Sequence, residues 1–334
     1  MQPPKIHILW EFLDGPWGGG NQFLKALRRE FIKNGVYTDN AANAEIILFN
    51  SHQFQKQTLR LKLQYPEKIF VHRVDGPIFQ TRGESGIVTD NKIFFCNDIA
   101  ADATVFQSEW SKNASYRQGL KKTPFEACII NAPDPDIFHP EATRRGANRE
   151  NRKTRLVTTT WSSNPRKGFD IFRYLDEHLD FSNYAMTFVG NTEIAFKNIE
   201  TIGPQPSDRL AEILRSHDIF IAASRNEPCS NSFLEALHCG LPAVARNDSS
   251  YPELLRGNGL LFSGEDDILE KIDAVAANPG SYVQSHNLPR IDEVAQNYLE
   301  FFAEISSQVR QKKYRPKRLS RLKYYFARLR LKSM

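Results

Sequence analysis

Long hydrophobic stretches are missing from this chain of 334 residues. No run of about 18 apolar residues occurs, so we expect no transmembrane helix. The first residues, Met-Gln-Pro-Pro-Lys, have no apolar core of the kind found in secretory signals and lead directly into a predicted strand. Short internal repeats and low-complexity segments are also missing. We therefore expect a globular protein that works in the cytoplasm.

Cysteine is scarce, and its spacing indicates no metal site. The chain has four cysteines, and no two of them form a Cys-x-x-Cys pair or another metal-binding spacing. Their positions are Cys96, Cys128, Cys229 and Cys239. Reduced thiols in a cytosolic protein are the simplest interpretation, and no metal site is predicted.

Acidic residues are missing from the C-terminal end of the chain. Residues 310–334 contain eleven Lys and Arg and neither Asp nor Glu. The whole chain has a formal net charge of +5, whereas the chain without these eleven has 33 basic and 39 acidic residues. The basic character therefore belongs to the tail. Few aromatic residues accompany a basic surface elsewhere, so nucleic acid is not expected as a partner.

The tail also has apolar residues at helical spacing. Four of them fall at i, i+3, i+7 and i+10 and would form one stripe on a helix: Leu319, Leu322, Phe326 and Leu329. Lys and Arg surround this stripe, and Tyr324 and Tyr325 would lie at the level of lipid headgroups. The pattern predicts contact with an anionic membrane surface. The alternatives are a disordered solubilising end and a final helix packed on the N-terminal domain.

Short apolar runs alternate with helical patterns along most of the chain. In the first half, strands are predicted at 6–10, 46–49, 68–74, 103–106 and 127–130, with an amphipathic helix at 22–33. In the second half, strands are predicted at 156–160, 185–189, 199–202 and 219–223. Strands that alternate with helices indicate parallel βαβ units. The fold class is therefore α/β, with two doubly wound, Rossmann-like domains and a cleft between them.

The polar stretch 142–154 is the best candidate for an interdomain linker. We predict an N-terminal domain at 1–145, a C-terminal domain at 146–310 and a basic amphipathic tail at 311–334.

The segment 224–242 has the strongest functional signal. Seven residues separate Glu227 from Glu235, and the apolar run before them predicts a buried strand. The helical spacing of the apolar residues after 232 predicts a helix that contains Glu235, so Glu227 lies in the preceding loop. The backbone N–H groups at the helix start, near Ser230, Asn231 and Ser232, suit an anionic phosphate. The two carboxylates suit sugar hydroxyls on one side and a ribose on the other.

This arrangement resembles the E-x7-E element of retaining, nucleotide-sugar-dependent glycosyltransferases of family 4 (glycosyl transferases group 1), which have the GT-B fold. The resemblance implies that Glu227 contacts the donor sugar and that Glu235 binds the ribose. The family usually has a Gly in the turn, where this chain has Pro228, Cys229 and Ser230. The donor sugar is therefore not implied. Taken alone, two Glu at this spacing are more typical of solvated helix charges.

Two further segments are similar to the same family. Residues 131–140 match its N-G-V-D-x-x-x-F-x-P segment at Asn131, Asp134, Phe138 and Pro140, which locates the crossing between the domains. Arg166 and Lys167 follow the first strand of the second domain and would bring two cations to a diphosphate. The alternative for this pair is a solvated basic turn. Only Lys167 carries over directly from the family pattern.

Four glycines in two other segments also belong to the candidate site. Gly18, Gly19 and Gly20 precede a helix and would bring backbone close to the donor or acceptor, although a simple tight turn explains them equally well. Gly203 lies in a segment whose backbone contacts the nucleotide base in relatives.

Many relatives have a catalytic-site His at the end of the strand that corresponds to 68–74. His72 or Asp75 could hold that place, and strand alternation points the two side chains in opposite directions. We favour Asp75 because it lies at the loop.

The resemblance implies a retaining transfer of a hexose from a nucleotide diphosphate sugar to the hydroxyl of a glycan or lipid-linked glycan, in polysaccharide or glycolipid synthesis. Glu227 is the first catalytic candidate, followed by Asp75 and His72. Arg166, Lys167 and the helix start would neutralise the leaving diphosphate, so no cofactor and no metal are expected. A peripheral position at the inner face of the membrane is the further expectation. The alternatives are a nucleotide-sugar epimerase with the same fold and a non-catalytic protein that binds sugar or nucleotide.

Overall fold

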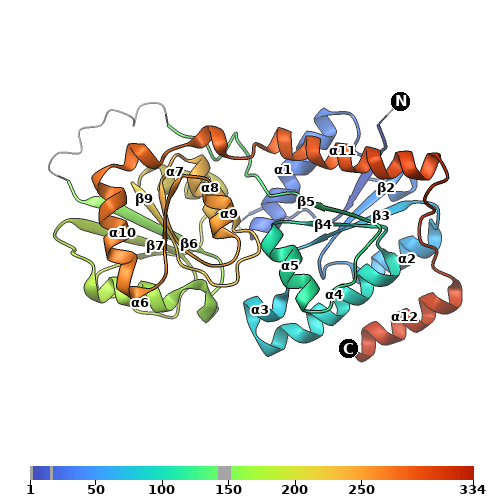
Figure 1. Cartoon of the computed structure of the whole chain (residues 1–334), viewed down its shortest axis with the longest axis horizontal. Coiled ribbons are helices and arrows are strands. Elements are labelled where there is room, and N and C mark those ends of the chain that lie inside the picture. The colour runs from blue at the N-terminus through green and yellow to red at the C-terminus, as the bar shows by residue number, and fades with distance from the viewer. Residues whose placement is uncertain (1–2, 16–17, 142–151) are drawn as a thin grey trace. The chain divides into compact units, whose positions relative to one another are not determined.

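The computed structural model describes residues 3–15, 18–141 and 152–334 (Figure 1). The chain forms two compact units. Unit 1 consists of Met1–Phe12, Leu24–Ile130 and Ile291–Met334, and unit 2 consists of Leu13–Phe23 and Asn131–Arg290. Each unit contains one parallel β-sheet with helices between its strands, which confirms the predicted α/β class.

The sheet of unit 1 has five strands in the order β1-β2-β3-β4-β5. Their bounds are β1 (Ile6–Leu9), β2 (Ile46–Asn50), β3 (Ile69–Val74), β4 (Ala103–Phe106) and β5 (Phe125–Cys128). Every residue of β2, β3 and β4 is buried, as expected for parallel strands covered on both faces. The strand predicted at 127–130 corresponds to β5, which begins and ends two residues earlier than predicted.

Helices connect these strands in βαβ fashion. They are α1 (Gly19–Lys33), α2 (Gln55–Gln64), α3 (Ile78–Arg82), α4 (Ile87–Ala100) and α5 (Glu109–Arg117). Short 3-10 turns lie at Ala41–Asn43 and Glu84–Gly86 in this unit, and at Pro165–Lys167, Pro279–Tyr282 and Ser285–Asn287 in unit 2.

The sheet of unit 2 has six strands in the order β11-β10-β9-β6-β7-β8. Their bounds are β6 (Thr154–Thr160), β7 (Tyr184–Gly190), β8 (Glu200–Ile202), β9 (Ile219–Ala222), β10 (Ala243–Arg246) and β11 (Gly259–Phe262). The helices are α6 (Phe169–His178), α7 (Ser207–Arg215), α8 (Asn231–His238), α9 (Tyr251–Leu255) and α10 (Glu265–Ala277). The strand order reverses between β6 and β9. This is the topological switch point at which open α/β sheets bind ligands.

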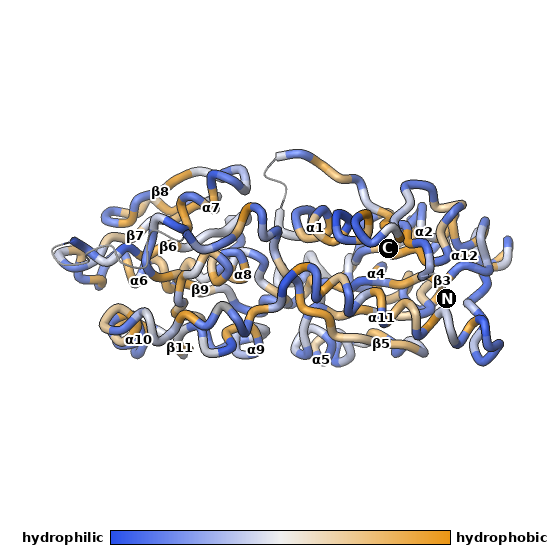
Figure 2. Tube along the Cα trace, turned by 90° about the horizontal axis from the view of Figure 1, so that it is seen from above, coloured by the Kyte–Doolittle hydropathy of each residue, from blue (hydrophilic) through white to orange (hydrophobic). Residues whose placement is uncertain are grey.

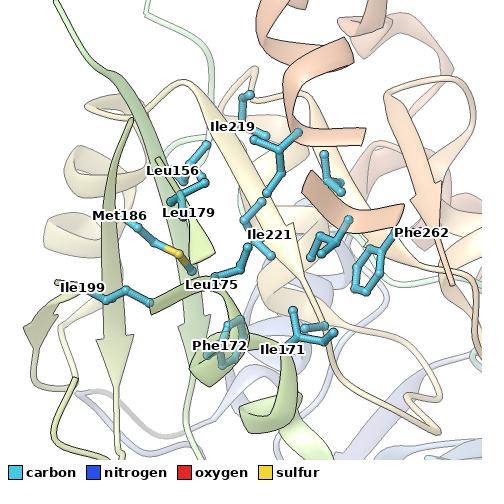
Figure 3. Close-up of a cluster of buried hydrophobic side chains, with 14 of the residues drawn as sticks. Leu156, Ile171, Phe172, Leu175, Leu179, Met186, Ile199, Ile219, Ile221 and Phe262 are labelled. Atoms are coloured by element: carbon cyan, nitrogen blue, oxygen red, sulfur yellow. The ribbon is translucent and has the colours of Figure 1, made fainter. Parts of the chain in front are cut away.

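Alternate residues of β9 pack on opposite faces of this sheet. Ile219 and Ile221 point to a core that includes Phe172 of α6 (Figure 3). Phe220 points the other way, and its ring lies 6.3 Å from that of Phe233 in α8. Both faces of β9 are therefore anchored, which fixes the start of the loop that carries Glu227.

The two last helices belong to unit 1. They are α11 (Ile291–Arg310) and α12 (Arg321–Ser333). The rings of Tyr298 and Phe302 in α11 lie 6.3 and 6.2 Å from that of Phe31 in α1. The predicted C-terminal domain, 146–310, thus differs from unit 2, because the apolar stripe of α11 is buried against unit 1. The predicted boundary at 145/146 and most of the linker 142–154 lie outside the described residues.

No helix within the described ranges is both long and apolar enough to cross a bilayer.

Candidate functional site

A cavity of about 200 Å³ opens at the carboxyl ends of β6, β7 and β9, at the switch point of the sheet. All of its lining residues belong to unit 2, including Gly18, Gly19 and Gln22 from the start of α1. The cavity is therefore described within one compact unit. Its position is the one that the doubly wound topology favours for a ligand.

The loop between β9 and α8 holds Glu227 through its backbone. Asn226 has a positive φ of 56°, which asparagine tolerates better than most residues. The N–H of Asn226 donates to Asp248 Oδ1 at 2.9 Å, and the N–H of Glu227 donates to Ser249 Oγ at 2.9 Å. The N–H of Ser250 donates to the carbonyl of Glu227 at 3.2 Å. The loop after β10 thus fixes the backbone of Glu227.

Lys167 meets Glu227 at the cavity wall. Lys167 Nζ donates to Glu227 Oε2 at 2.6 Å, and the Glu227 side chain is 15% exposed. The two charges compensate each other in a partly desolvated site. A diphosphate that approached Lys167 would compete with this carboxylate for the same ammonium group.

The basic turn fits against the end of β9 because residue 168 is glycine. Gly168 has φ +88°, and an added Cβ would lie 2.4 Å from Ala223 Cβ. The N–H of Arg225 donates to the carbonyl of Arg166 at 2.7 Å. The turn that carries Lys167 and the loop that carries Glu227 are therefore joined through backbone contacts.

Gly168→Ala should destabilise unit 2 by about 1–3 kcal/mol, because alanine combines a strained φ with a collision at Ala223. Thermal unfolding measures the change. Gly280→Ala is the matched control, since an added Cβ there meets nothing within 4 Å. Equal melting temperatures for the two variants would contradict the close approach of the turn to β9.

The first turn of α8 forms another wall of the cavity. Ser230 caps the helix, with its Oγ accepting the N–H of Phe233 at 3.3 Å and lying 3.2 Å from Ser232 Oγ. Asn231 Oδ1 accepts from Asn131 Nδ2 at 3.0 Å. The positive end of the helix dipole and the serine hydroxyls suit the oxygens of a phosphate.

Glu235 lies on the same helix, on the side that lines the cavity. The residue is only 7% exposed. Burial raises the pKa of its carboxyl group from 4.5 to about 7. An acidic group that is costly to ionise in the empty protein is one that a ligand with hydroxyl donors would stabilise as the carboxylate.

The structure brings six of the predicted donor-site residues together around one cavity: Lys167, Glu227, Ser230, Asn231, Ser232 and Glu235. Gly18 and Gly19 line the same cavity, but Gly20 is not among its described lining residues. Pro204 and Gln205 line it in the place predicted for Gly203.

Arg166 also differs from the prediction. It is not among the described lining residues, although its neighbour Lys167 is. The 3-10 turn at Pro165–Lys167 directs consecutive side chains differently, so only one of the two cations contributes to the cavity wall.

His72 is a correction. Its side chain is fully buried in the core of unit 1, where the ring stacks on Phe49 at 4.2 Å between centroids. Its Nδ1 and Nε2 lie 2.9 Å from Asn97 Oδ1 and 3.1 Å from the carbonyl of Ser51. Burial lowers the pKa of His72 to about 4. The imidazole is a neutral core group, so it has no surface with which to contact a sugar.

Asp75 lies in the loop after β3, as the prediction required. Its Oδ1 accepts from Arg73 Nη1 at 2.9 Å and from Gln107 Nε2 at 2.6 Å. Its Oδ2 accepts from Asn50 Nδ2 at 3.4 Å. The carboxylate is thus held by three side chains at the carboxyl ends of β2, β3 and β4.

Sequence reasoning missed the residues that close the other end of the cavity. Thr159 and Thr160 end β6, the exposed Trp161 follows it, and Gly190 ends β7. Gly190 has φ +135°, and an added Cβ would lie 1.7 Å from the carbonyl oxygen of Thr160. A polar run at the carboxyl end of a predicted strand was the available signal for these positions.

The Asp134-Pro-Asp136 triplet has a structural role. Asp134 Oδ1 accepts the N–H of Asp136 at 2.9 Å, which forms a tight turn. Among the residues that the structure describes, no group of three or more His, Cys, Asp or Glu side chains is placed to hold a metal ion.

The family model of the glycosyl transferases group 1 matches residues 169–278, which include both Glu227 and Glu235. The predicted resemblance to the glycosyl transferases group 1 is thus confirmed. Alpha-galactosylglucosyldiacylglycerol synthase of Streptococcus pneumoniae is 29% identical over 129 residues. The alignment covers 34% of this chain and 34% of that protein, so it spans about a third of the relative's length.

Solved structures show the fold over nearly the whole chain. HepE of Anabaena, in complex with UDP and glucose, has a TM-score of 0.65 and 12% identity, and the match covers 93% of this chain and 100% of that one. AviGT4, a glycosyltransferase of avilamycin A biosynthesis, has a TM-score of 0.60 and 14% identity, and the match covers 91% of this chain and 98% of that one. Sucrose-phosphate synthase of Thermosynechococcus elongatus has a TM-score of 0.56 and 16% identity, and the match covers 88% of this chain and 78% of that one. The predicted GT-B fold is confirmed.

Proposed function

We propose that this chain is a glycosyltransferase that moves a hexose from a nucleotide diphosphate sugar to an acceptor hydroxyl. The observation that carries the proposal is the cavity at the switch point of unit 2. It collects one cation, two carboxylates and a capped helix N-terminus. These groups match the diphosphate, the sugar hydroxyls and the ribose of such a donor. All of them except Lys167 lie within residues 169–278, which match the glycosyltransferase family model.

The diphosphate would lie between Lys167 and the first turn of α8. Lys167 Nζ and the N–H groups at the helix start would stabilise the charge that develops on the leaving phosphate. Glu227, released from Lys167 by the incoming phosphate, would then accept hydrogen bonds from hydroxyls of the donor sugar. Glu235 would accept the ribose hydroxyls. The base would extend toward Trp161, Pro204 and Gln205 at the other end of the cavity.

The reaction that we propose retains the anomeric configuration and needs no metal. The C1–O bond to the diphosphate breaks, the acceptor oxygen bonds to C1 on the same face, and the leaving phosphate oxygen takes the acceptor proton. Charge neutralisation by Lys167 and the α8 N-terminus supports a metal-independent route. Asp75 stays a catalytic candidate.

We propose a glycan or a lipid-linked glycan as the acceptor, in the synthesis of a polysaccharide or a glycolipid. The relative from Streptococcus pneumoniae is named for a glycosylated diacylglycerol, which supports a lipid-linked acceptor. HepE of Anabaena was solved with UDP-glucose, which supports a uridine nucleotide as the first donor to test. The cytoplasmic side of a membrane is the proposed place of the reaction.

A thermal-shift screen of UDP- and GDP-sugars tests the proposal. A donor at 100 times its Kd stabilises the native state by about 2.7 kcal/mol, which raises the melting temperature by roughly 5 °C or more. Lys167→Ala should lower this stabilisation to about 0.4–1.4 kcal/mol, the value for binding weakened tenfold to a hundredfold. Lys197→Ala, an exposed lysine of unit 2 outside the cavity, should keep the full shift. A screen in which no nucleotide sugar raises the melting temperature would overturn the proposed donor class.

A further inference from the structure

The inner face of α12 is packed on unit 1 (Figure 1). Ala327 and Leu331, together with Leu319 before the helix, are buried against three residues of α2 and α4: Leu59, Cys96 and Ala100. The final helix therefore packs on the N-terminal part of the chain, which was one of the alternatives for the tail. The predicted membrane stripe is corrected at Leu319, whose side chain belongs to this buried face.

The outer face of α12 has a second apolar stripe. It consists of Leu322, Tyr325, Phe326 and Leu329, which are 67%, 62%, 64% and 63% exposed. Their spacing of i, i+3, i+4 and i+7 places them on one side of the helix. The trace of α12 accordingly alternates between hydrophilic and hydrophobic residues (Figure 2). These four side chains are half of the large exposed hydrophobic residues found in the described part of the chain.

A groove adjoins this stripe. It has a volume of about 470 Å³, and its lining includes the apolar residues Phe95 and Ile99 of α4 and Phe326 of α12. Four cations also line it: Lys317, Arg318, Lys323 and Arg330. A groove lined by apolar and cationic side chains suits an acyl chain whose headgroup carries a phosphate.

Asp98, the acidic residue of the groove, is paired. Its carboxylate accepts from Lys121 Nζ at 2.7 Å, and its carbonyl accepts from Lys317 Nζ at 2.9 Å. The surface that faces a ligand is therefore dominated by positive charge.

A buried aspartate fixes the segment that leads into α12. Asp102 Oδ1 accepts from Tyr314 Oη at 2.8 Å and from the N–H of Lys317 at 2.6 Å. Its Oδ2 pairs with the buried Lys62 at 2.8 Å. These contacts hold the chain on unit 1 just before the helix begins. The outer stripe is consequently presented on a fixed support rather than on a loose tail.

Charge identifies the occupant of this surface. The exposed cations Arg321, Lys323, Arg328 and Lys332 lie along α12 beside the stripe, and residues 310–334 have no acidic side chain. An isolated apolar stripe would suit a protein partner or a second copy of the chain equally well. A stripe bordered by cations along its length complements an anionic lipid surface. There the apolar side chains contact the acyl chains while the cations contact the lipid phosphates.

We propose that the outer face of α12 and the adjoining groove dock unit 1 on an anionic phospholipid bilayer. Leu322, Phe326 and Leu329 enter the boundary between headgroups and acyl chains, and Tyr325 lies at the headgroups. The flanking cations contact the lipid phosphates. This docking does not depend on the transferase activity, and it would bring a lipid-linked acceptor to the protein that carries the donor cavity.

Cosedimentation of the full chain with vesicles tests the proposal. Vesicles of phosphatidylglycerol and phosphatidylcholine should bind the protein at least tenfold more strongly than pure phosphatidylcholine, and 0.5 M NaCl should weaken binding at least tenfold. The triple change Leu322→Ser, Phe326→Ser and Leu329→Ser should lower binding at least tenfold while the melting temperature stays within about 2 °C. Truncation after Gln311 would instead uncover Leu59 and Cys96, so substitutions are the sharper change.

Ile87→Ser with Val88→Ser is the matched control, because both side chains are exposed hydrophobic residues of unit 1 on α4. This variant should bind anionic vesicles like the unchanged chain. Protein that stays in the supernatant with anionic vesicles at low salt overturns the proposal, as does undiminished binding of the triple variant. A dimer that the triple change dissociates would identify a second copy as the occupant and would also overturn it. The nucleotide-sugar thermal shift of the same variants reports on the donor site separately.

Discussion

Lys167→Ala should weaken the binding of the nucleotide sugar by about tenfold to a hundredfold, the amount expected for a lost hydrogen bond between charged groups. Lys167 Nζ lies 2.6 Å from Glu227 Oε2 at the cavity wall. Its removal takes a cation away from the diphosphate and leaves a partly buried carboxylate beside it without that partner. Isothermal titration with the best donor from the thermal-shift screen measures the loss. Lys197→Ala should change the affinity by less than about twofold.

The same pair allows a double-mutant cycle. Glu227→Ala alone should lower turnover by about tenfold to a hundredfold with little change in donor affinity, because the role that we propose for Glu227 is to orient the sugar. In the Lys167→Ala background, Glu227→Ala should restore part of the lost affinity, since it removes the carboxylate that repels the diphosphate. If both single variants, Lys167→Ala and Glu235→Ala, bind the donor with unchanged affinity, the donor-site assignment is refuted.

Glu235→Gln should make the protein progressively more stable than the unchanged chain as the pH rises from about 4.5 to above 7. Burial raises the pKa of Glu235 to about 7, so the folded state favours the protonated carboxyl group. Relative to an exposed glutamate, the protonated carboxyl group of Glu235 contributes its full stabilisation of the folded state below pH 4.5. This contribution is lost as the pH rises through 7, because the buried group must then ionise. The difference amounts to about 3 kcal/mol. Urea unfolding of both proteins at pH 5 and pH 8 measures it, and the comparison cancels the titration of all other groups.

Donor affinity should depend on pH in the opposite sense. In the proposed donor complex the ribose hydroxyls donate to the carboxylate of Glu235, so affinity for a nucleotide sugar should rise between pH 6 and pH 8 in the unchanged chain. Glu235→Gln should remove this dependence. The diphosphate of a nucleotide sugar does not titrate in this range, which leaves Glu235 as the group tested. A stability difference between the two proteins that stays constant from pH 5 to pH 8 would contradict the raised pKa.

Much of the fold could be predicted because its signals are local. Apolar runs at strand length and the helical spacing around Phe233 and Leu237 give a doubly wound topology, and the switch point then follows from the order of the strands. Glu227 and Glu235 could be placed because one lies in the loop after a buried strand and the other lies on the cavity side of the next helix. Their separation along the chain is enough to bring them to the same cavity.

The remaining features depend on tertiary contacts that no local pattern contains. Arg166 and Lys167 are chemically alike, and only the folded structure shows Lys167, and not Arg166, among the described residues that line the cavity. The strand pattern left His72 and Asp75 open as candidates, and only the packing of the His72 ring on Phe49 shows that His72 is buried.

The two helices at the C-terminal end show the same limit. The apolar residues of α11 indicate a buried helix without naming the unit that buries it. The helix α12 has apolar residues on two faces, so spacing alone assigned Leu319 to the outer stripe and left Tyr325 out of it.

The central claim is that the cavity of unit 2 breaks the bond between a sugar and a nucleoside diphosphate with retention. Proton NMR of the full chain at high concentration with UDP-glucose, or with whichever donor the screen selects, tests it without an acceptor. The account predicts slow release of the nucleoside diphosphate, with the free sugar first appearing as the anomer of the donor, and loss of this hydrolysis in Lys167→Ala. A donor that remains intact would identify a binding protein, and a donor converted to its epimer would identify an epimerase. Either result would contradict the account, and first release of the opposite anomer would contradict retention.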